Sequence, residues 1–411
     1  MPEFLELLPP GEALALLLRN LPEPSPAVEK VQTAQALDRV TAAAVTAPEP
    51  LPAFSRSTVD GYAVRARDTF GASDSLPAYL TVAGEVPMGR APNFSLQPGQ
   101  AALIHTGGML PQGADAVVMV EYTQPAREGE VEVLRAAAPG ENELRAGEDV
   151  QLGQTVIHQG AALRPAEIGG LMALGLTQVA VAVRPRAAVL STGDEVVRPA
   201  NIVRPGQVRD VNSYTLSALV EQYGGSPVRY GIIPDRREAL EKALRRALDE
   251  CDMAIITAGS SASTRDLTAQ VIDAMGKPGV LAHGVNVKPG KPTILGVCGG
   301  KPVIGLPGNP VSALVIAGLF VVPVIERLLG LTRPRMHAVV SARLAVNLPS
   351  QAGREDWVPV RLVEGAQGLT ADPIFYKSNL IFSLAQADGL LRIPPDATGL
   401  ETGALVEVQI L

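Results

Sequence analysis

Cysteine is nearly absent from this 411-residue chain, which contains only Cys251 and Cys298. The two lie far apart and inside apolar runs, so the sequence predicts buried reduced thiols and argues against a disulfide or a cysteine metal site. Aromatic residues make up only 4% of the chain against 46% hydrophobic residues, so Ala, Val, Leu and Ile must form the cores. Histidine occurs four times without metal-ligand spacing, and a structural role is expected for each: His105, His158, His283 and His337.

An excess of positive charge is also missing. Lys and Arg number 35 against 42 Asp and Glu, giving a net charge of -7, which argues against non-specific nucleic-acid binding. The N-terminus is acidic and lacks the pattern of a signal peptide. The longest apolar run, residues 311–325, is too short to cross a bilayer and contains Pro323, so it predicts a buried helix. We therefore expect a cytoplasmic protein that binds neither nucleic acid nor a membrane.

The common phosphate fingerprints are absent as well. No G-x-G-x-x-G follows a strand, and the Walker-like string at residues 84–90 lacks both Lys and Ser/Thr. What the chain has instead is a Pro/Gly turn carrying Lys288 and Lys291, followed by a second rigid turn, GLPGNP at 305–310, that opens an apolar helix. Rigid turns, lysine charge and free amides at a helix start favour an anion site.

Changes in composition divide the chain into four parts. Residues 1–50 and 139–177 predict a discontinuous, elongated helical and β linker, and residues 51–138 predict a small β-rich domain. Residues 178–331 alternate strands and helices, which is typical of a parallel sheet covered by helices on both faces. Short alternating strands in residues 332–411 predict a C-terminal β-barrel.

Two helix starts are predicted from local signals. Ser25 and Pro26 precede apolar residues at helical spacing, and Asp235 with Glu238 three residues later forms a capping-box pattern. A third helix is expected over residues 212–223, which end at a Gly-Gly pair.

Three polar turns follow predicted strands of the α/β region. They are residues 191–195, residues 257–261 leading to Asp266, and residues 305–310. Ligands of open α/β sheets bind at this edge, so a phosphate-bearing ligand is predicted there, although polar residues also cap such loops in proteins without a ligand.

Four carboxylates accompany these turns. They are Asp194, Glu195, Asp210 and Asp266. Repelling carboxylates beside an anion site are explained if Mg²⁺ bridges them to phosphate oxygens, so the set predicts a metal site. Asp210 alone is more simply a helix-cap neighbour.

Taken in order, the motifs resemble the molybdopterin molybdenumtransferase family, the bacterial MoeA proteins related to the E domain of gephyrin. The matching strings run along nearly the whole chain: STVDGYAV, HTGGMLPQGADAVV, AGEDV, STGDE, RDVNSY, NVKPGKP, GLPGNPVSA and SNLIFSLAQADGL. The resemblance implies a multidomain α/β plus β fold. Its parts are a doubly wound αβα molybdopterin-binding domain, a small β domain, an elongated linker domain and a C-terminal barrel.

The resemblance also implies a reaction and an assembly. The family inserts molybdate into adenylylated molybdopterin and releases AMP with the help of Mg²⁺, in a homodimer whose active site lies between subunits. A molybdopterin adenylyltransferase and proteins that mature molybdoenzymes are further partners to expect.

Site residues follow from the motif positions. The resemblance implies catalytic roles for Asp60, Glu195, Asp266, Lys288 and Lys291. The metal ligands expected are Asp194, Glu195, Asp210 and Asp266. Substrate contacts are expected from Thr106, Asp149, Thr192, Gly193, Ser261, Pro307, Gly308, Asn309, Ser312, Arg354 and Ser378.

The chain departs from the family pattern in one loop. Ala258 and Ser263 stand where the family has glycines, and a Cβ is costly where a backbone needs positive φ or close approach to a ligand. A non-catalytic pterin-nucleotide-binding or scaffold paralogue is therefore an alternative. An enzyme of another class that binds nucleotides at the same α/β edge is a third hypothesis.

Overall fold

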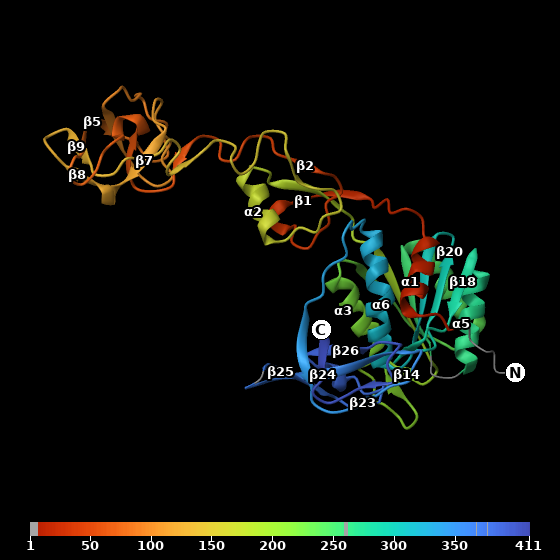
Figure 1. Ribbon diagram of the computed structural model, residues 1–411. Coiled ribbons are helices and arrows are strands. Elements are labelled where there is room, and N and C mark those ends of the chain that lie inside the picture. Colours follow the sequence, from red (N-terminus) through yellow and green to blue (C-terminus); the bar gives the residue numbers. More distant parts are fainter. Residues whose placement is uncertain (1–6, 259–261, 367, 376) are drawn as a thin grey trace.

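The chain forms a long arm and a larger body, seen side by side in Figure 1. The computed structural model describes residues 7–258, 262–366, 368–375 and 377–411. We call residues 28–182 the arm, which leaves the body with β1 (Val28–Gln32) and returns with β12 (Gln178–Ala182). These two strands pair antiparallel, so the arm begins and ends at one place.

The end of the arm, which we call the tip (residues 58–142), is a six-stranded sheet in the order β7-β4-β6-β5-β9-β8. Two separate groups of buried apolar residues form its cores. The β-rich domain predicted for residues 51–138 is confirmed in this region. The strand bounds are β4 (Gly61–Val64), β5 (Ala78–Glu85), β6 (Gln100–Ile104), β7 (Ala116–Met119), β8 (Thr123–Pro125) and β9 (Glu130–Val133).

Between tip and body the arm narrows to short antiparallel pairs and one helix. Here β3 (Arg56–Ser57) pairs with β10 (Glu143–Leu144), and β2 (Val45–Thr46) pairs with β11 (Thr155–Ile157). The helix is α2 (Pro165–Ala173), which has a proline at its first position, where no backbone N–H is needed.

The helix predicted from Ser25 and Pro26 is wrong, because residues 28–32 form β1. Val28 and Val31 pair across to β12, and their β-branched side chains favour that strand. The helix near the N-terminus lies earlier, at α1 (Pro10–Arg19), which packs against α6 (Pro310–Leu328) in the body.

The centre of the body is a six-stranded sheet in the order β16-β13-β17-β21-β20-β18. The predicted parallel sheet is found for four neighbouring strands, but β20 runs antiparallel to both of its neighbours, β21 and β18, so the sheet as a whole is mixed. The reversal occurs at Gly299 and Gly300, which both have positive φ (+56° and +81°) and form a tight hairpin between β20 and β21. The strand bounds are β13 (Arg186–Thr192), β16 (Ser226–Ile233), β17 (Met253–Ala258), β18 (Pro278–His283), β20 (Ile294–Cys298) and β21 (Lys301–Pro307).

Helices cover both faces of this sheet, as expected for a doubly wound domain. One face buries α1, α6 and α3 (Asn212–Gln222), while the other buries α4 (Arg237–Glu250) and α5 (Ala262–Ala274). The capping box predicted at Asp235 is wrong: α4 begins at Arg237, after an N-cap residue, Arg236, that makes no side-chain cap bond. The Asp235 amide instead donates to Asp194 Oδ1 at 3.3 Å, which ties this segment to the loop after β13.

Helix α6 is the 19-residue core helix predicted from the apolar run. It is long and apolar enough to cross a membrane by length and composition, but 67% of its most apolar stretch is buried inside the fold. Both cysteines are also buried and free, as predicted.

The C-terminal strands close into a five-stranded barrel, because β24 pairs with both β25 and β26. With the helix-covered sheet and the β-rich tip, this barrel confirms the predicted fold class. The barrel strands are β22 (Val339–Leu344), β24 (Glu355–Gly365), β25 (Gly368–Pro373), β26 (Gly389–Ile393) and β28 (Leu405–Ile410). The smaller elements of the body are β14 (Val196–Val197), β15 (Val208–Arg209), β19 (Val287–Lys288), β23 (Leu348–Pro349), β27 (Gly399–Leu400) and α7 (Phe382–Ala385).

Candidate functional site

A cavity of about 510 Å³ lies where the barrel meets the α/β sheet, and we call it the cationic cavity. It forms because β19, which contains Lys288, pairs in parallel with the first residues of barrel strand β24. Three cations line it, Lys288, Lys291 and Arg354, against one carboxylate, Asp356. The predicted residues that line it are Lys288, Lys291, Pro307, Asn309, Ser312, Arg354 and Ser378.

The charged groups of this cavity differ in how many partners they have within the protein. Asp356 is buried and accepts two hydrogen bonds from the Arg354 guanidinium, at 2.6 and 3.0 Å. The Lys288 ammonium lies 3.9 Å from the same carboxylate. Among the described residues, the Lys291 ammonium has no hydrogen-bond or ion-pair partner and is exposed. Lys291 is therefore the cation with most capacity left for an anionic ligand.

The lysine turn is fixed by close packing. Gly290, between the two lysines, has φ +112°, and a Cβ there would lie 2.2 Å from Cγ1 of Ile316 on α6. Only glycine fits both this backbone angle and this contact. The side chains of Lys288 and Lys291 thus start from a backbone held against the core helix.

A second cavity, of about 610 Å³, lies beyond the carboxyl ends of β13, β17 and β21, and we call it the edge cavity. The predicted residues that line it are Thr192, Glu195, Asp210, Gly308 and Asn309. Asn309 lines both cavities, so the 305–310 turn lies between them. That turn is held from both sides: Asn212 Nδ2 donates to Gly308 O at 2.8 Å, and Asn309 Nδ2 donates to Ser378 Oγ at 2.8 Å.

Asp210 has a structural role within the edge cavity. Its Oδ1 accepts from the Ser213 amide (3.0 Å), close to the start of α3, and from Ser191 Oγ (2.9 Å). This agrees with the helix-cap alternative for Asp210. Among the residues described, Thr192 Oγ1 and Asn212 Oδ1 are buried without a hydrogen-bond partner.

Other predicted residues lie outside these cavities. Gly193 is buried, Asp194 is exposed and accepts from the Asp235 amide, and Asp266 is exposed on α5, but none lines either cavity. Ser261 lies outside the described residues. Within the described part of the chain, no three His, Cys, Asp or Glu side chains are grouped to hold a metal ion. The structure thus brings the lysines and two of the four carboxylates to adjoining cavities.

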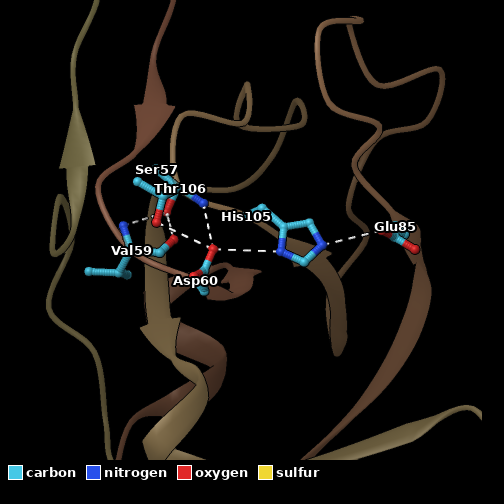
Figure 2. Close-up of polar contacts among 6 residues, drawn as sticks. All are labelled: Ser57, Val59, Asp60, Glu85, His105 and Thr106. Atoms are coloured by element: carbon cyan, nitrogen blue, oxygen red, sulfur yellow. Dashed lines mark hydrogen bonds and ion pairs between the residues drawn. The ribbon is translucent and has the colours of Figure 1, made fainter.

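The remaining predicted residues lie on the arm, away from the body in Figure 1. Asp60 and Thr106 meet at the tip, where Asp60 Oδ1 accepts from the Thr106 amide at 2.8 Å and from its hydroxyl at 3.3 Å (Figure 2). The hydrogen bond from the Thr106 amide lowers the pKa of the Asp60 carboxyl, and the neighbouring His105 lowers that pKa further. Asp149 is exposed, outside the tip, and its amide donates to Leu51 O.

Sequence reasoning missed several residues of these sites. His105 was expected to be a satisfied structural histidine, but it is partly exposed between two carboxylates. Asp356, Trp357 and Phe375 line the cationic cavity without having been singled out. A sequence signal existed only for Asp356, which lies two residues after Arg354 and so faces the same side of a strand.

Family comparisons agree with this geometry along almost the whole chain. Residues 8–175 match the MoeA N-terminal region (domain I and II), residues 188–327 a molybdopterin-binding domain, and residues 341–411 the MoeA C-terminal region (domain IV). The chain belongs to the MoeA family. The resemblance seen in the sequence motifs is therefore confirmed.

Individual relatives extend over nearly the full length. The molybdopterin molybdenumtransferase 2 of Mycobacterium tuberculosis is 36% identical, covering 92% of this chain and 94% of its own. The molybdopterin molybdenumtransferase of a Nostoc species is 35% identical, covering 89% and 84%. A crystal structure of the molybdopterin biosynthesis MoeA protein of Pyrococcus horikoshii covers 99% of this chain and 100% of its own, with 33% identity and a TM-score of 0.85. This MoeA chain is thus an enzyme of the molybdopterin molybdenumtransferase type, in molybdenum cofactor biosynthesis.

Proposed function

We propose that this chain inserts molybdate into adenylylated molybdopterin and releases AMP in a Mg²⁺-dependent step. The observation that carries the proposal is a pair of cavities that share Asn309 as a lining residue, one cationic and one at the carboxyl edge of the sheet. A ligand with an oxyanion at one end and a nucleotide at the other needs two such compartments in contact. As the two dithiolene sulfurs bond to molybdenum, two oxygens of molybdate would take up protons and leave as water. A water molecule would attack the phosphoanhydride, so that one phosphate stays on the pterin and AMP leaves.

The cationic cavity has the chemistry to hold molybdate and the neighbouring phosphate. Lys288, Lys291 and Arg354 supply positive charge, while the hydroxyls of Ser312 and Ser378 supply neutral donors. These groups act as an anion clamp that stabilises developing charge, not as nucleophiles. Because Asp356 already accepts both Arg354 hydrogen bonds, Lys291 is expected to contribute the largest share of anion affinity.

The edge cavity suits a magnesium ion that is bound together with the substrate. Glu195 and Asp210 both line it, and Mg²⁺ commonly takes one or two carboxylates and completes its shell with phosphate oxygens and water. The donor chemistry of these two residues fits that pattern, while Asp194 and Asp266 would act from farther along the same edge. When bound, the ion would neutralise phosphate charge.

Asp60, Thr106 and Asp149 require a second copy of the chain if they are to reach the substrate. In a single chain the arm extends away from both cavities (Figure 1). We therefore propose a homodimer in which the partner's arm covers the site, with the protein acting in the cytoplasm beside a molybdopterin adenylyltransferase and molybdoenzyme-maturation proteins.

An AMP-release assay tests this function. Purified protein receives adenylylated molybdopterin, Mg²⁺ and molybdate, and AMP is measured against Asp266→Asn and Lys288→Ala variants. Molybdate-dependent release above both variants supports the proposal, and omission of Mg²⁺ should abolish it. Release no faster than in the variants would reject it.

A non-catalytic pterin-nucleotide-binding or scaffold protein is the second candidate. The replacement of family glycines by Ala258 and Ser263 favours it. Ordinary affinity for adenylylated molybdopterin without turnover in the same assay would establish this alternative, and efficient turnover would exclude it.

A further inference from the structure

Three side chains from neighbouring strands meet at one edge of the tip sheet. Strand β4 begins at Gly61 opposite Ile104, the last residue of β6, so Asp60 and His105 flank this pair. Strand β5 runs parallel to β6 and ends with Glu85 at the same edge. The order β4-β6-β5 therefore places the imidazole between the two carboxylates.

Both nitrogens of His105 face a carboxylate (Figure 2). Nδ1 lies 3.5 Å from Asp60 Oδ1, and Nε2 lies 3.3 Å from Glu85 Oε1. A neutral imidazole has one N–H and would turn a lone pair toward one of the carboxylates. Only a ring protonated at both nitrogens donates to Asp60 and Glu85 together.

These contacts restrict Asp60 to one orientation. Oδ1 receives the Thr106 amide, the Thr106 hydroxyl and the His105 ring, whereas Oδ2 has no partner among the described residues. The Asp60 side chain is 62% exposed, so Oδ2 is open to whatever approaches the tip.

Stability does not account for this arrangement. The side chains of His105 and Glu85 are 45% and 61% exposed, and exposed ion pairs contribute little to folding. What the chain of contacts does is fix the direction of the free Asp60 oxygen.

We propose that His105 is a positioning residue for the reaction: held by Glu85, it fixes the Asp60 carboxylate so that Oδ2 faces the substrate. This inference rests on the proposed function, since Asp60 would act across the subunit interface. His105 acts through Asp60 and does not itself touch the substrate.

A double-mutant cycle tests whether His105 acts through Asp60. His105→Phe should lower the kcat of AMP release roughly tenfold in the wild-type background but less than about twofold in the Asp60→Asn background. Glu85→Gln should lower kcat in the same direction by roughly threefold. His158→Phe, the same change at an exposed histidine elsewhere on the arm, should leave kcat unchanged. Equal losses in both backgrounds would overturn the inference.

A second measurement is independent of activity. In carboxyl ¹³C NMR titrations, His105→Phe should raise the pKa of Asp60 toward its ordinary value, because the His105 contribution that lowers it is gone. The thermal midpoint should change by no more than about 2 °C. If wild-type protein releases no AMP, the proposed function fails, and an unchanged Asp60 titration would separately reject the positioning role.

Discussion

The cationic cavity and the arm tip hold their charged groups in opposite ways. In the body, Asp356 is buried, accepts hydrogen bonds from Arg354 and lies 3.9 Å from the Lys288 ammonium. The turn that carries Lys288 packs against the core helix α6. At the tip, Asp60 and His105 are exposed and held by hydrogen bonds between strand ends. The charged groups of the cationic cavity are held by a buried carboxylate and close packing, whereas those of the tip are oriented by hydrogen bonds but remain exposed to solvent.

This difference indicates how the two regions divide the work. In the body, the buried Asp356 carboxylate fixes the Arg354 guanidinium and a closely packed turn fixes the two lysines, so the cations are in place in one chain before a charged ligand binds. The electrostatic interactions of an exposed carboxylate become strong only when another surface covers the carboxylate and excludes water from it. The body is therefore expected to bind the anion alone, while the tip becomes effective on assembly.

The largest effect should come from removing Lys291, the cation of the cationic cavity that has no partner among the described residues. Lys291→Met should lower AMP release by about 10²–10³-fold, since it removes a preorganised charge from an anion site. Lys242→Met, at an exposed lysine of α4, is the matched control and should retain full activity. Retained activity in Lys291→Met would mean that the cationic cavity is not the molybdate site.

Mixing two impaired variants tests whether the body and tip residues of one active site come from different subunits. Asp60→Asn and Lys291→Met, co-expressed with separate tags, should form heterodimers with one intact site, recovering about a quarter of wild-type activity in a random mixture. All of the recovered activity should be found in the heterodimer that is isolated through both tags. No recovery in that isolated species would show that both residues serve the site from the same chain.

Much of the body could be predicted from the sequence, because its periodic patterns are long. The alternation of strands and helices predicted over residues 178–331 and the helix from Asn212 are both found in the structure. The antiparallel direction of β20 was missed, although the Gly299-Gly300 pair between two apolar runs is a hairpin signal. Residues 28–32 were mistaken for a helix because the pairing with β12, across the whole arm, decides their conformation.

The candidate site was predictable in composition but not in arrangement. Lysines in a Pro/Gly turn predicted an anion site, and Lys288 and Lys291 do line a cavity. Its division into two compartments depends on β19 pairing with β24, a contact between distant segments that no local pattern specifies. The triad at the tip was missed for the same reason, since His105 meets Glu85 only through the strand order.

Matched glycine substitutions should separate the two regions by stability. Gly290→Ala places a Cβ 2.2 Å from Ile316 and should destabilise the body by about 2–4 kcal/mol. Gly71→Ala at the tip meets nothing within 4 Å and has φ +85°, so it should cost about 1 kcal/mol. In calorimetry, Gly290→Ala should lower the melting temperature of the body, and Gly71→Ala should lower that of the arm. A single shared transition shifted equally by both would contradict the division.

Thiol labelling should report the body alone, because Cys251 lies at the end of α4, Cys298 lies on β20, and no cysteine lies on the arm. Burial raises the pKa of Cys251, and it raises the pKa of Cys298 to about 11. At pH 8 both thiols therefore stay protonated and should react with a disulfide reagent far more slowly than in the unfolded chain. Gly290→Ala should speed this reaction by opening the body more often, whereas Gly71→Ala should leave it unchanged. Equal acceleration by both variants would mean that arm and body open together, so that the tip could not move independently onto a partner's cavity.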